Sequence, residues 1–218
     1  MLPIVVDSEM FRRLQLEKLL RLVKCSIFGA DSFNNDLTWR IFDSGMRDVI
    51  FVLDKSLSEN FFYLKHTTIF YAPRSSNNSN SIYAEILNLL QDIKPAIVEL
   101  ALQTCGVLRL EGLVLAGAQL TLMPKKVTRS LHTDPPKIAQ VLLGLTMEGS
   151  AILTLQAVDK KIEQFKVDVS QGYMLVDEAV GNNPLYKHMV DKVCDTGRYS
   201  VLFRFCRQVN ELEDVGPF

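Results

Sequence analysis

The spacing of apolar residues predicts an amphipathic helix near the start of the chain. Within residues 8–28, apolar side chains recur at three- to four-residue intervals, and Asp7 or Ser8 is suited to cap the first turn. The apolar positions are Met10, Phe11, Leu14, Leu19, Leu22 and Val23. We expect this helix to pack on a sheet through that face.

The pattern then changes twice before the middle of the chain. Residues 37–72 hold short runs rich in β-branched and aromatic residues, separated by Gly, Asp, Ser and Asn, which favours strands. Residues 73–81, PRSSNNSNS, are typical of a flexible loop. Residues 82–105 predict a second helix, kinked or broken before Pro95 because the proline ring cannot continue the hydrogen-bond ladder. This helix is too apolar to face solvent on all sides.

After residue 112 the whole chain has the pattern of strands, spaced at the 8 to 12 residues that are typical of a sandwich or jelly roll. The fold class is therefore predicted as α+β, with a jelly roll supported by helices from the N-terminal half. The strand-like segments read LVLAGAQLTLM, IAQVLLGLTM, SAILTLQA, KIEQFKVDV, GYMLVDEA, PLYKHMVDKV and RYSVLFRFC.

Composition narrows the class of protein without naming a partner. The 218 residues are 48% hydrophobic and 22% charged, which is typical of one ordinary globular domain. The net charge is −1, so no global basic field indicates nucleic acid or an anionic membrane. The first ten residues do not resemble a signal peptide and no segment is apolar enough to span a bilayer, so we expect a cytoplasmic or nuclear protein.

Two of the three histidines have the placement of metal ligands. His132 precedes Asp134 by two residues, and in an extended segment positions i and i+2 point to the same face. His188 follows 188 − 132 = 56 residues later, which is enough for four strands to cross a jelly roll and return. Two imidazoles and one carboxylate would bind a metal ion and leave three positions open for a cosubstrate and O₂. His66 is interpreted as structural.

The last predicted strand has one polar and one apolar face. Period-two alternation puts Arg198, Ser200, Leu202 and Arg204 on one side and Tyr199, Val201, Phe203 and Phe205 on the other. If the apolar face packs outward, two guanidinium groups point into the barrel, where they require anionic partners. A dicarboxylate would supply one, through a bidentate pair with Arg198 and a hydroxyl bond from Ser200. An edge strand with its arginines in water is the alternative.

Together these residues resemble the signature of the Fe(II)/2-oxoglutarate-dependent dioxygenase superfamily over residues 112–206. The resemblance implies a double-stranded β-helix, with Fe(II) bound by His132, Asp134 and His188 as the catalytic centre. It also implies 2-oxoglutarate held by Arg198 and Ser200, with Arg204 acting near the carboxylate on the iron, and O₂ as cosubstrate. RYSVLFR is similar to the Arg-x-x-x-x-x-Arg strand of AlkB-type dealkylases, and TET/JBP-type base hydroxylases are alike in this region.

The resemblance indicates one dioxygenase domain over residues 1–218. Residues 1–111 would supply helices and lid strands, 112–206 the catalytic jelly roll, and 207–218 a tail. The chain lacks the Asn-x-Tyr that AlkB-type enzymes carry on the strand before His-x-Asp.

A nucleic-acid base, in single-stranded DNA or RNA or flipped out of a duplex, is the substrate that we favour. Lys125, Lys126 and Arg129 would meet phosphates at the pocket rim, and aromatic residues of the 61–80 segment would stack on the base. A small metabolite and a protein side chain are the alternative substrates. A jelly-roll binding protein without catalytic activity is the alternative of a different class, and no obligate protein partner is inferred.

Overall fold

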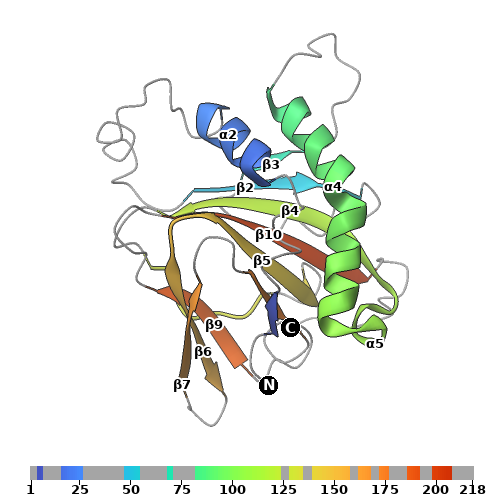
Figure 1. Ribbon diagram of the computed structural model, residues 1–218. Helices are drawn as coiled ribbons and strands as arrows, with labels where there is room; N and C mark the ends of the chain where they lie inside the picture. The colour runs from blue at the N-terminus through green and yellow to red at the C-terminus, as the bar shows by residue number, and fades with distance from the viewer. Residues whose placement is uncertain are drawn as a thin grey trace, which may run out of the picture.

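The computed structural model of the chain describes residues 4–6, 16–26, 47–54, 68–70, 82–123, 128–134, 139–157, 162–167, 172–176, 186–191 and 198–207 (Figure 1). Its helices are α2 (Leu16–Ser26), α4 (Ile82–Cys105) and the short α5 (Val107–Leu110). Three strands precede residue 112: β1 (Ile4–Val6), β2 (Arg47–Val52) and β3 (Thr68–Phe70). The later strands are β4 (Leu113–Met123), β5 (Val141–Glu148), β6 (Ala151–Ala157), β7 (Ile162–Val167), β8 (Gly172–Leu175), β9 (Tyr186–Asp191) and β10 (Arg198–Arg207).

The strands form two sheets within the described part of the chain. The larger has the order β1-β8-β5-β10-β4-β2-β3 and is antiparallel except for the β2–β3 pair. The smaller has the order β7-β6-β9. In Figure 1, α2 and α4 lie over one face of the larger sheet and the smaller sheet lies on its other side. The result is a β-rich, mostly antiparallel fold of jelly-roll type with few helices, as the sequence predicts.

Apolar packing holds these layers together in two places. One cluster joins the helices to the larger sheet, and includes Leu19 and Val23 of α2 and Ile93 and Ile97 of α4. The other cluster contains residues of both sheets, including Leu153 and Leu155 of β6 and Leu142 of β5. The described part of the first predicted helix therefore does pack on a sheet through its apolar face. Residues 8–15 and 27–28 of that prediction lie outside the described residues.

Strand β10 is central to the larger sheet and is buried on both faces. It pairs antiparallel with β4 on one side and with β5 on the other. Tyr199, Val201, Phe203 and Phe205 belong to the cluster under the helices, so the apolar face packs outward. The opposite face, which carries the two arginines, looks toward the smaller sheet. The predicted alternation is confirmed, and the edge-strand alternative is wrong.

Two predictions before residue 112 need correction. The sequence predicts that the helix at 82–105 is kinked or broken before Pro95; α4 is continuous through Pro95, so a break is wrong. Buried apolar side chains before and after the proline, Ile93 and Ile97 among them, hold both halves of the helix against the sheet at the cost of one hydrogen bond. The sequence also gave no sign of β1, which pairs with β8.

Several predictions fall outside the described residues. They include the strand at 37–42, the loop at 73–81, the tail beyond Arg207, and His66. Among the residues that the structure describes, no helix is long and apolar enough to cross a membrane.

Candidate metal and anion site

Backbone pairing brings the two histidines of the predicted metal site together. The segment 128–134 runs beside β9, where His132 N–H donates to His188 O at 2.9 Å and His188 N–H donates to His132 O at 2.8 Å. Arg129 N–H extends the pairing by donating to Val190 O at 2.8 Å. In the described part of the sequence between the two histidines lie four strands, β5 to β8, as predicted.

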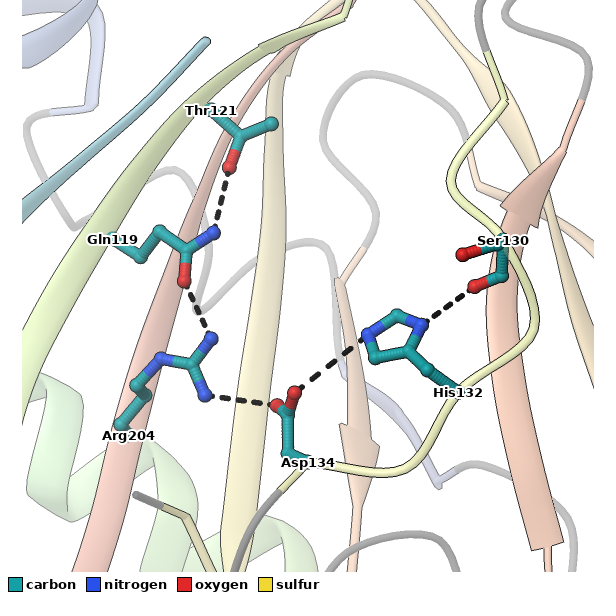
Figure 2. A network of polar contacts seen from close by, with 6 residues as sticks. All are labelled: Gln119, Thr121, Ser130, His132, Asp134 and Arg204. Carbon is teal, nitrogen blue, oxygen red and sulfur yellow. Dashed lines mark hydrogen bonds and ion pairs between the residues drawn. The ribbon is translucent and has the colours of Figure 1, made fainter. Parts of the chain in front are cut away.

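The side chains of His132, Asp134 and His188 converge. Each offers one ligand atom, and these atoms all lie within 4.8 Å of one another. His132 Nε2 is 3.6 Å from Asp134 Oδ1, and the two imidazole centroids are 4.4 Å apart. His132 Nδ1 lies 2.6 Å from the carbonyl oxygen of Ser130, a bond that assigns the proton to Nδ1 and leaves Nε2 as the acceptor (Figure 2). The group could therefore hold a metal ion.

The other oxygen of Asp134 is bound by an arginine. Arg204 Nη1 donates to Asp134 Oδ2 at 2.8 Å, and Arg204 Nη2 donates to Gln119 Oε1 (Figure 2). Burial alone would raise the pKa of Asp134, but the charge of Arg204, with smaller effects of His188 and His132, lowers that pKa below its ordinary value. The carboxylate is therefore ionised at neutral pH and suited to bind a cation.

His188 is buried and uncharged. Burial, reinforced by the nearby positive charges, lowers the pKa of His188 to about 4, although Asp134 opposes the shift. Its Nδ1 is buried and has no hydrogen-bond partner among the described residues. A buried nitrogen without a partner is costly.

Arg198 lies fully buried in the same pocket without a carboxylate partner. It is 1% exposed, and its Nε and Nη2 donate to Thr146 Oγ1 at 3.1 and 3.0 Å. Burial lowers the pKa of Arg198, while interaction with the side chain of Tyr173 opposes the shift. No carboxylate of the described residues forms an ion pair with it. Ser200 Oγ, also buried, has no hydrogen-bond partner in that part of the chain.

The pocket unites all six residues that the sequence predicts to bind the metal or the cosubstrate. It is lined by His132, Asp134, His188, Arg198, Ser200 and Arg204. Arg129 lines it too, whereas Lys125 and Lys126 lie outside the described residues. Whether the group binds a metal ion or a cosubstrate stays a prediction.

Sequence reasoning missed three polar residues around this site. Gln119 on β4 binds Arg204, Thr146 on β5 binds Arg198, and Tyr173 on β8 lines the pocket. Gln119 and Thr121 interrupt an apolar strand at alternate positions, and this was the one available signal. Thr146 and Tyr173 gave none, because their role depends on which strand neighbours which.

Comparisons with known proteins find partial likenesses in structure only. No protein-family model matches the sequence, and no curated protein matches it. An oxalate oxidase in complex with glycolate is 16% identical with a TM-score of 0.34, over 45% of this chain and 43% of that chain. The oxalate decarboxylase of Lactobacillus farciminis, in a formate complex, is 13% identical with a TM-score of 0.33, over 43% of this chain and 24% of that chain. A mutant oxalate decarboxylase of Bacillus subtilis is 17% identical with a TM-score of 0.32, over 40% of this chain and 21% of that chain.

The chain thus matches less than half of the length of each of these proteins. A likeness of this extent carries no argument about activity, so the function rests on the residues of the site.

Proposed function

We propose that the protein is an Fe(II)- and 2-oxoglutarate-dependent dioxygenase, formed by one domain over residues 1–218 with its catalytic jelly roll, a double-stranded β-helix, at 112–206. One observation carries the proposal. A group of two imidazoles and a carboxylate, with ligand atoms within 4.8 Å of one another, shares a pocket with a buried guanidinium that has no carboxylate partner among the described residues.

The donor set fits Fe(II). His132, Asp134 and His188 would hold the ion as two nitrogen ligands and one oxygen ligand, the combination typical of non-haem Fe(II) oxygenases. The site has the correct protonation states before any ion arrives, because Asp134 is ionised and His188 is neutral at pH 7. The bond from His132 Nδ1 to Ser130 O is the kind of outer contact that orients a histidine ligand.

The part of the pocket around Arg198 and Ser200 fits a carboxylate. Arg198 would pair with the distal carboxylate of 2-oxoglutarate, and Ser200 would donate the hydroxyl that has no other partner in the described chain. A buried, uncompensated guanidinium is expensive, so an anion at this position would offset that cost. Arg204 keeps one buried donor, Nε, without a partner among the described residues, and we assign it to the carboxylate that would bind the iron.

When bound, Fe(II) and 2-oxoglutarate supply the means to activate O₂ and oxidise a C–H bond. The chain itself supplies positioning. Arg198 and Ser200 orient the dicarboxylate, Asp134 and the two histidines fix the metal, and Leu202 and Val190 on the pocket wall limit the access of water.

As substrate we propose a nucleic-acid base, hydroxylated or oxidatively dealkylated. Arg129 supports this choice because it lies at the pocket beside His132, where it could contact a phosphate. If Arg129 contacts phosphates, the affinity for single-stranded oligonucleotides falls steeply as the salt concentration rises. Arg129→Met then lowers this affinity and also makes it less dependent on salt. Salt-independent or absent binding would instead favour a small metabolite or a protein side chain.

The central test is anaerobic titration with Fe(II) and 2-oxoglutarate. We expect a weak visible charge-transfer band in the wild type, and succinate release when O₂ is admitted. His132→Ala should remove the band and metal binding together. Arg198→Met should retain metal binding but weaken 2-oxoglutarate by about 10- to 100-fold, since a hydrogen-bonded charge pair is lost.

Arg207→Met is the matched control, because Arg207 is exposed at the end of the same strand. It should titrate like the wild type. If the wild type gives neither band nor succinate, and His132→Ala binds as much metal as the wild type, the protein is a jelly-roll binding protein and the proposal is wrong.

A further inference from the structure

We propose that Gln119 is a positioning residue for the metal centre: by holding one arm of Arg204, it makes Asp134 meet the ion through a single oxygen. The inference rests on the proposed function to the extent that an ion must bind between His132, Asp134 and His188. Gln119 itself touches neither the ion nor a cosubstrate in this scheme.

A continuous chain of polar contacts connects Gln119 to the candidate ligands (Figure 2). Gln119 Nε2 donates to Thr121 Oγ1 at 3.4 Å, and its Oε1 accepts from Arg204 Nη2. Arg204 Nη1 then donates to Asp134 Oδ2 at 2.8 Å. Asp134 Oδ1 remains, and it faces His132 Nε2 at 3.6 Å, on the side where the ion would bind.

The need for Gln119 follows from the geometry of a guanidinium. An arginine beside a carboxylate prefers to direct two parallel N–H groups at its two oxygens. Such a fork would occupy Asp134 Oδ1 as well as Oδ2 and compete with the metal for the ligand atom. Because Gln119 accepts from Nη2, only Nη1 is directed at the carboxylate, and the planar group cannot rotate without losing that bond.

The direction of the Gln119 amide is set by its neighbour. Thr121 lies two residues on along β4, on the same face of the strand, and both side chains are almost fully buried. With the NH₂ end of the amide on Thr121 Oγ1, the carbonyl end faces Arg204. The buried amide is thus satisfied at both ends and has one orientation.

This arrangement controls how many positions of the ion the protein occupies. With Asp134 bound through Oδ1 only, the three residues would supply three ligands, and a six-coordinate ion would keep three positions open. A carboxylate that bound through both oxygens would take a fourth position. Three open positions are what a bidentate 2-oxo acid and O₂ require together.

The test measures metal binding rather than turnover, with Mn(II) for affinity and Co(II) for its visible d–d spectrum. Gln119→Met has a similar volume but cannot accept from Arg204. We expect it to weaken Mn(II) by about 10- to 100-fold, the usual loss when the contact that orients a ligand is disturbed, here that of Arg204 with Asp134, and to change the Co(II) spectrum. Gln119→Glu keeps an oxygen for Arg204 and should restore both readouts.

Gln140→Met is the matched control, because Gln140 lies just before β5 and does not line the pocket. It should bind like the wild type. If Gln119→Met does not fold, as judged by circular dichroism, Thr121→Val removes the acceptor that orients the amide and should give the same spectral change with a smaller loss of affinity.

The possible outcomes separate the two proposals. If Gln119→Met has the affinity and spectrum of the wild type, Gln119 has no positioning role, and the metal site still stands. The same conclusion follows if Gln119→Met does not fold and Thr121→Val has the spectrum of the wild type. If the wild type binds neither Mn(II) nor Co(II), or binds them as well after His132→Ala, the metal site and the role of Gln119 both fall.

Discussion

Gly144 gives Tyr173 the space to reach the pocket. The two residues face each other across β5 and β8, and a Cβ atom on Gly144 would lie 2.4 Å from Tyr173 Cζ. No real Cβ approaches a ring carbon so closely, so any larger residue forces the ring to move. The position of this tyrosine, which lines the pocket together with Arg198, therefore depends on the absence of a side chain at Gly144.

We predict that Gly144→Ala destabilises the protein by about 1–3 kcal/mol, the usual cost of overpacking a core. Tyr173→Leu should offset part of this loss in the double variant, because the smaller side chain removes the clash. Urea denaturation of the wild type, both single variants and the double variant measures the coupling. Additive free energies of unfolding would show that the ring and the added methyl do not interfere.

At this scale the sequence predicts residues whose partners are close in the chain or share a strand. His132 and Asp134 are predicted to share a face because they are two residues apart in an extended segment, and His188 is predicted from its separation of 56 residues from His132. Arg198 is predicted from the alternation of polar and apolar residues on the last strand. Gln119 and Tyr173 could not be assigned a role, because this requires the order and register of β4, β10, β5 and β8. Pairing between distant strands is set by packing of the whole domain, and no local pattern encodes it.

Helix α4 illustrates how tertiary packing overrides a local signal. The apolar spacing over 82–105 predicts the helix with the correct bounds. Pro95 predicts a kink or a break, and the break is absent. Pro95 is exposed on the solvent side of the helix, so its ring displaces no packed side chain. The missing hydrogen bond is therefore a local cost that the buried face outweighs. The opposite failure is β1, whose three residues are too few to show a pattern.

Pro95→Ala should consequently stabilise the protein. Restoring the hydrogen bond removes a helix penalty of about 3 kcal/mol, and greater freedom of the unfolded chain takes back about 1 kcal/mol, for a net gain of about 2 kcal/mol. Chemical denaturation measures it. Asn88→Ala, at another exposed position of α4, is the control and should gain less than about 0.7 kcal/mol. An unchanged or lower stability of Pro95→Ala would mean that the helix does not bear this cost.

The contact between α2 and the larger sheet predicts a pH dependence. Lys24 pairs with Glu148 and lies 5.3 Å from the ring centroid of Tyr199. Burial, with the charge of Glu148, raises the pKa of Tyr199 to about 12, above its ordinary 10.0. As the pH rises, the unfolded chain therefore loses the phenol proton of Tyr199 before the folded chain does. The free energy of unfolding consequently falls between pH 10 and pH 12.

Tyr199→Phe should lose less stability than the wild type across this range of pH. The other tyrosines and lysines titrate in both proteins, so the difference between their free energies of unfolding isolates Tyr199. Curves that fall in parallel between pH 10 and 12 would contradict the raised pKa.

For the molecule as a whole, metal binding should be visible as stability. An ion that binds only the folded chain adds about 2.7 kcal/mol at one hundred times its Kd. We expect Mn(II) to raise the melting temperature of the wild type and to leave that of His132→Ala unchanged. Scanning calorimetry measures both, and Mg(II), which favours oxygen ligands, serves as the control ion. Equal responses of the two proteins to Mn(II) would place the ion elsewhere.

The backbone pairing of His132 with His188 gives this stabilisation a particular form. An ion shared by the two imidazoles would act as a removable cross-link around the loop of 188 − 132 = 56 residues that contains β5 to β8. Because the ion leaves when the chain unfolds, it stabilises through its binding to the folded state, whereas a disulfide persists and restricts the unfolded chain. If the ion is the iron proposed above, a cell short of iron would lose this protein to proteolysis, because the strands between the two histidines open more often without the ion.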